Sequence, residues 1–154
     1  FGIGVAAYVV VLVLDVLVSW GLYVVLRPVD RELSLLAAAL RLLYTGTMFG
    51  AMAALVLLRP DAYLYGQLTA YVFFITHVLI LGYLVYVSGY VNRFLGAFLI
   101  VASFCYVFLL YGEHALPQAM NDAILPIVMI PATFAEISLG IWLLVRAKTL
   151  PEAM

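Results

Sequence analysis

The chain has 154 residues, of which 68% are hydrophobic and only 10% are charged, whereas soluble domains are about 45–50% apolar and about 25% charged. A soluble core of this size could not hold so many apolar side chains, so the excess predicts a membrane protein whose surface faces lipid. The formal net charge of −1 argues against nucleic acid as a partner, because nucleic-acid binders carry a basic patch or stripe.

Five apolar stretches are long enough, at about 20 residues each, to cross a bilayer as helices. Between the first two, Pro28 cannot continue a helix and Asp30 is well placed to cap the next one. The sequence therefore predicts an all-α polytopic bundle, with residues 1–154 forming a single transmembrane domain. The five predicted spans are Ile3–Leu26, Leu33–Leu58, Tyr63–Val87, Phe94–Tyr111 and Ala123–Val145.

The breaks between these spans carry turn residues and charge. The longest break runs from Gly112 to Asp122 and contains Glu113 and His114, which we interpret as a solvated outer loop. The chain begins at Phe1, already apolar and without the charged region that opens a signal peptide. We therefore expect missing residues upstream, with room for one more span.

The basic residues divide unevenly between the two sides of the membrane. One side holds only Arg59, and the other holds Arg27, Arg31, Arg93, Arg146 and Lys148. Cytoplasmic loops carry the excess of Lys and Arg. The sequence thus predicts a multi-pass protein of the cell inner membrane with its C-terminus in the cytoplasm.

Four of the five spans carry one ionisable residue deep inside an apolar run, where charges are costly and are usually paired or functional. Each lies eight to eleven residues from the proposed cytoplasmic end of its span, or roughly 12–17 Å at 1.5 Å per residue. The remaining span offers a serine at this depth and a tyrosine one turn deeper. This predicted polar layer consists of Asp15, Arg41, His77, Ser103, Tyr106 and Glu136.

Two interpretations of the polar layer stay open. Arg41 should pair with Asp15 or Glu136, because a permanent cation attracts a carboxylate strongly at this depth. The layer is then either a network that fixes the register of the helices, or a site that also binds or moves a proton, an ion or a small molecule through His77 and the remaining acid.

Cofactor and catalytic motifs are not evident, and no metal site or cofactor is predicted. His114 lies far in depth from His77, which disfavours haem ligation by two histidines, and no His-Glu-x-x-His pattern occurs. Ser103 has no glycine-rich elbow to make it a nucleophile. Cys105, the only cysteine, is interpreted as a packing residue.

Small residues and prolines should shape the packing. Gly46, Gly50 and Ala54 share one helical face and predict close helix approach, within the bundle or else at an oligomer interface. Pro126 and Pro131 should bend the last span before Glu136.

Three regions of the chain carry distinctive segments: residues 25–30 (VLRPVD) with 36–42 (LAAALRL), 73–84 (FFITHVLILGYL) with 88–90 (SGY), and 131–139 (PATFAEISL) with 142–144 (WLL). Together they resemble a widespread bacterial family of polytopic membrane proteins classed as a domain of unknown function. The resemblance places Arg41, His77 and Glu136 on motif positions and Asp15 on a position that is often acidic, whereas Asn92 and Ala135 replace a frequent Pro and a frequent Gly. It implies the helical membrane fold and an additional N-terminal span, and no activity.

Taken together, the sequence favours a non-enzymatic structural or auxiliary membrane subunit with a buried polar network. Its expected partners are the lipid bilayer and either other membrane subunits or further copies of itself. The alternative is a binding or transport protein for a small molecule, proton or ion, and an intramembrane enzyme is the third possibility.

Overall fold

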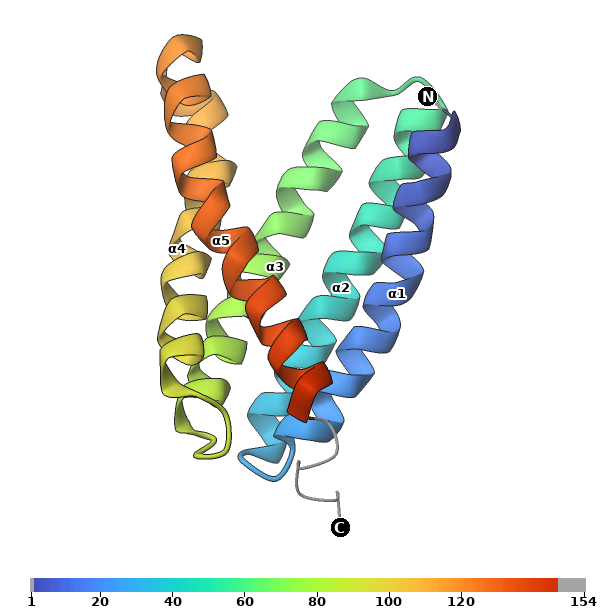
Figure 1. Cartoon of the computed structure of the whole chain (residues 1–154). Helices are drawn as coiled ribbons and strands as arrows, with labels where there is room; N and C mark the ends of the chain where they lie inside the picture. The colour runs from blue at the N-terminus through green and yellow to red at the C-terminus, as the bar shows by residue number, and fades with distance from the viewer. Residues whose placement is uncertain (1, 147–154) are drawn as a thin grey trace.

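The computed structural model describes residues 2–146, apart from the side chains of residues 109, 112–115 and 119. Within that part of the chain all regular structure is helical, and five helices follow one another in alternating directions (Figure 1). The prediction of an all-α bundle is confirmed. The helices are α1 (Gly2–Leu26), α2 (Arg31–Val56), α3 (Pro60–Val87), α4 (Arg93–Ala115) and α5 (Gln118–Arg146).

The helices suit a membrane. α1, α2, α3 and α5 are long and apolar enough to cross one, and the apolar part of α4 in which side chains are described, Arg93–Phe108, is shorter. Large apolar side chains such as Leu17, Phe104 and Leu144 stand exposed on the outside of the bundle. In water this surface would be strongly unfavourable, and lipid is the solvent in which it is stable.

Local residues at the helix starts define the first two connections, between α1 and α2 and between α2 and α3. The side chain of Asp30 accepts a hydrogen bond of 2.9 Å from the backbone N–H of Leu33, which caps α2 as predicted. Pro60 occupies the first turn of α3, where its missing N–H costs nothing.

The connection between α4 and α5 is much shorter than predicted. Most of the expected break from Gly112 to Asp122 is helical, because α4 runs to Ala115 and α5 begins at Gln118. The carbonyl of Pro117 accepts hydrogen bonds from the next turn and so starts α5. The polar residues of this segment are typical of a loop, but a helix at a membrane surface can continue through polar residues. The helix is interrupted only near Pro117, because proline cannot continue a helix. Asp122 is exposed, while the side chains of Glu113 and His114 lie outside the described residues.

Glycines allow close helix packing at a different place from the one predicted. A Cβ on Gly96 of α4 would lie 2.4 Å from the backbone nitrogen of Tyr86 on α3, and one on Gly82 would also meet the α4 backbone. By contrast, no atom lies within 4 Å of such a Cβ on Gly46 or Gly50. Of the two alternatives for this face, the contact within the bundle is not found at Gly46 and Gly50, because that face of α2 is turned outward. The alternative of an oligomer interface stays a prediction.

Two apolar clusters divide the bundle along its length. The larger one draws on all five helices, with residues such as Leu26, Val78, Leu99 and Leu139. The smaller one, around Met48, joins only α1, α2 and α3. Accordingly, α4 and α5 diverge from the other three helices toward the end that holds the α2–α3 connection (Figure 1). Tyr106, one of the predicted polar residues, is itself a member of the larger cluster.

Candidate functional site

A buried ion pair joins α1 to α2. The Arg41 guanidinium donates from Nε at 3.2 Å and from Nη2 at 2.5 Å to the same carboxylate oxygen of Asp15. The side chains of Arg41 and Asp15 are only 12% and 13% exposed. The expected pairing of Arg41 with an acid is therefore confirmed, and Asp15 is its partner.

His77 extends this pair to α3. Its Nε2 lies 3.2 Å from Nη1 of Arg41, and its Nδ1 lies 2.8 Å from the carbonyl oxygen of Ala37. Since a guanidinium can only donate, Nε2 must accept and Nδ1 must donate, which is the arrangement of a neutral imidazole. Ala37 and Arg41 are one turn apart on α2, so a single ring meets both. We call Asp15, Arg41 and His77 the charge cluster.

Phe74 is a member of the site that the sequence reasoning missed. Its ring lies 5.9 Å from Cζ of Arg41, within the range of a cation–π contact. It also packs at 4.7 Å against the ring of Tyr44 and at 5.1 Å, edge on, against that of Tyr106. The available signal was its spacing of three residues from His77, which places both side chains on one face of α3.

Ser19 is a second missed contact. Its hydroxyl is buried and donates a 3.0 Å hydrogen bond to the carbonyl oxygen of Ala38 on α2. Ser19 lies one turn from Asp15, so α1 is tied to α2 at two successive levels.

Glu136 forms a separate hydrogen-bonded pair between α4 and α5. The hydroxyl of Tyr106 on α4 donates a 2.7 Å hydrogen bond to Oε1 of Glu136 on α5. Among the residues that the structure describes, no basic side chain is close enough to form an ion pair with Glu136. The predicted layer thus consists of two units: the charge cluster on α1, α2 and α3, and the Tyr106–Glu136 pair on α4 and α5.

Ser103 does not connect helices. It is buried, and its hydroxyl donates at 2.7 Å to the carbonyl oxygen of Ile100 within α4. Its own helix therefore satisfies its hydroxyl, and of the two predicted residues on α4 it is Tyr106 that reaches a neighbouring helix.

A cavity of about 230 Å³ separates the two units. Arg41 and Glu136 are its polar lining residues, and its apolar lining comes from α1, α3 and α5, including Leu22, Leu81 and Leu139. Among the residues whose side chains are described, no three acidic, histidine or cysteine side chains gather to hold a metal ion. The role of the predicted layer as a ligand or proton site stays a prediction.

Comparison with known proteins finds a family model and a relative that each match most of the chain. A family model described as "Domain of unknown function (DUF4386)" matches residues 1–62 and 45–147. A protein of Archaeoglobus fulgidus described as "Uncharacterized protein" is 30% identical over 148 residues, which cover 94% of this chain and 83% of that protein. No solved structure matches significantly.

Proposed function

The chain belongs to the DUF4386 family of unknown function, and from its structure we propose that it is a non-enzymatic multi-pass membrane subunit, structural or auxiliary in role. In this proposal the charge cluster locks α1, α2 and α3 into one rigid unit. The remaining helices, α4 and α5, are attached to that unit mainly through the α3–α4 contact.

One observation carries this proposal: a single guanidinium holds side chains from two other helices. Arg41 uses Nε and Nη2 for Asp15 and Nη1 for His77. The charges of Arg41 and Asp15 cancel, and His77 is neutral in this arrangement. A closed, neutral cluster of this kind suits a role in fixing helix register, which is the best supported use of buried polar groups.

The proposal is tested by removing the cluster as a whole. The variant with Asp15→Leu, Arg41→Met and His77→Leu should insert, fold and support the cellular phenotype of the wild-type protein, because apolar packing can replace a buried ion network. A knockout strain supplies the phenotype, and helical circular dichroism with size-exclusion chromatography checks the fold. If the variant is folded and inserted but does not restore the phenotype, the cluster has a chemical role and the structural proposal is overturned.

We also propose that the end of the bundle carrying Arg27, Arg31 and Arg93 faces the cytoplasm and that the protein resides in the cell's inner membrane. The support is the bias of basic residues toward this end. Single cysteines at positions 93 and 118, in a Cys105→Ala background, should react with an impermeant maleimide from opposite sides of the membrane. Labelling of both positions from outside in sealed cells would overturn the orientation.

A further inference from the structure

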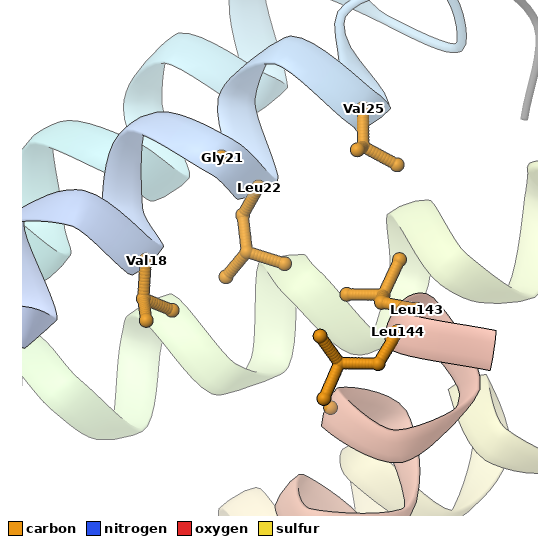
Figure 2. A pocket seen from close by; sticks show the side chains of 7 residues that line it. Val18, Gly21, Leu22, Val25, Leu143 and Leu144 are labelled. Carbon is orange, nitrogen blue, oxygen red and sulfur yellow. The ribbon is translucent and has the colours of Figure 1, made fainter. Parts of the chain in front are cut away.

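An apolar groove runs between α1 and α5 and leads to the polar cavity. It has a volume of about 420 Å³, and Figure 2 shows side chains of α1 on one wall and Leu143 and Leu144 of α5 on the other. The groove and the polar cavity share lining residues from both helices, so they lie next to each other. The shared residues are Val18, Leu22, Gly140 and Leu143.

The two ends of this space differ in chemistry. The groove end is lined entirely by apolar residues, whereas the inner end presents Arg41 and Glu136. The charge of Arg41 is already balanced by Asp15. Glu136 accepts one hydrogen bond, from Tyr106, and no basic side chain in the described part of the chain forms an ion pair with it. The inner end therefore presents a buried carboxyl group that has no ion-pair partner among the described residues.

We propose that this space binds a lipophilic cation, a single-chain amphiphile whose ammonium head pairs with Glu136 and whose alkyl chain fills the groove between α1 and α5. This goes beyond the structural role of the charge cluster. A carboxylate at this depth is unfavourable without a partner of opposite charge, and an ammonium head supplies one.

The spacing of the lining residues fits such a ligand. On α5, Glu136, Gly140 and Leu144 follow one another at intervals of four residues and so share one helical face. Eight residues of helix correspond to roughly 12 Å, so the groove continues along the bundle from the carboxylate by about that distance. On α1, Val18 and Leu22 line the opposite side. The gap between the two helices also opens the site to lipid, from which an amphiphile would enter.

Binding is tested with three photoactivatable probes that share one alkyl-diazirine chain and carry a trimethylammonium, a hydroxyl or a carboxylate head. The full-length protein is reconstituted in phosphatidylcholine nanodiscs, irradiated, and mapped by mass spectrometry. We expect the ammonium probe to label peptides of α1 and α5 that line the groove. Its affinity should exceed that of the other two probes by about tenfold or more, as expected for a buried charge pair.

Variants separate a specific site from general lipid contact. Glu136→Gln keeps the side-chain size and should lower the affinity for the ammonium probe by about tenfold or more. Gly140→Leu should block the groove, because the position lines it and no atom lies within 4 Å of a Cβ there. Gly50→Leu is the matched control, because it is equally open and lies on α2 away from the groove. If Gly140→Leu does not fold, Gly21→Leu blocks the same groove from α1.

Three results would overturn the proposal. Equal labelling by all three heads, with no effect of Glu136→Gln, would show that ordinary membrane lipid fills the groove. Protection of the groove peptides from every probe would show that a hydrophobic segment of a longer chain or another subunit covers it. Native mass spectrometry that finds dimers dissociated by Gly140→Leu would assign the groove to a second copy of the chain.

Discussion

Removing the guanidinium of Arg41 should destabilise the bundle far more than removing the whole charge cluster. We expect Arg41→Met to lower the free energy of unfolding by about 3–5 kcal/mol, the usual effect of breaking a buried ion pair from one side. The Asp15 carboxylate, with a side chain only 13% exposed, would lose its sole ion-pair partner among the described residues. The acceptor nitrogen of His77 would lose its donor as well, and an unsatisfied buried acceptor costs about 1–3 kcal/mol.

The triple variant with Asp15→Leu, Arg41→Met and His77→Leu removes every group that the single variant leaves unpaired. Its stability should return to within about 1.5 kcal/mol of the wild type, because well-packed apolar residues replace buried ion networks at little cost. Reversible unfolding with sodium dodecyl sulfate in mixed micelles, followed by circular dichroism, measures both values. The reasoning is refuted if the single variant loses less than about 1 kcal/mol, a loss too small for a broken buried pair. A triple variant as unstable as the single one would refute it equally.

Four further substitutions test other contacts in the same unfolding assay. Gly96→Ala should lower the free energy of unfolding by about 1–3 kcal/mol or more, because the added methyl group forces α3 and α4 apart. Gly46→Ala is the control at an open position and should not lower it. Equal effects of the two substitutions would disprove the close crossing of α3 and α4. Tyr106→Phe should cost about 1–3 kcal/mol through loss of the hydrogen bond to Glu136, and an unchanged stability would show that this bond contributes nothing. Burial raises the pKa of Tyr90, at the α3–α4 connection, above its ordinary value of 10.0. The neutral phenol therefore stabilises the folded state fully below pH 10, and this stabilisation is lost as the pH rises through the raised pKa. Above about pH 10 the stability of the wild type should fall more steeply than that of Tyr90→Phe, and parallel curves would contradict this.

The apolar spans and the stop signals around Asp30 and Pro60 were readable from the sequence because they depend on neighbouring residues, whereas the ends of α4 and α5 that face each other were predicted too short. A run of about 20 apolar residues forms a helix in lipid whatever its partners are, since its backbone must be hydrogen-bonded internally. Asp30 and Pro60 likewise act within one turn of their own helices. The position of Arg41 along α2 also follows from residue spacing alone.

The partners of the buried polar residues were decided by the tertiary structure. Asp15 and Glu136 have similar predicted depths, and the spacing along the chain cannot tell which one meets Arg41. Arg41 pairs with Asp15 because α1 packs on α2, whereas α5 packs on α4 and its acid meets Tyr106 instead. Helix rotation about its own axis likewise turns Gly46 outward and Gly96 inward. The rise per residue of an α-helix is constant, so the sequence alone gives the position of each side chain along the helix axis. The direction in which that side chain points relative to the other helices depends on how all five helices pack together.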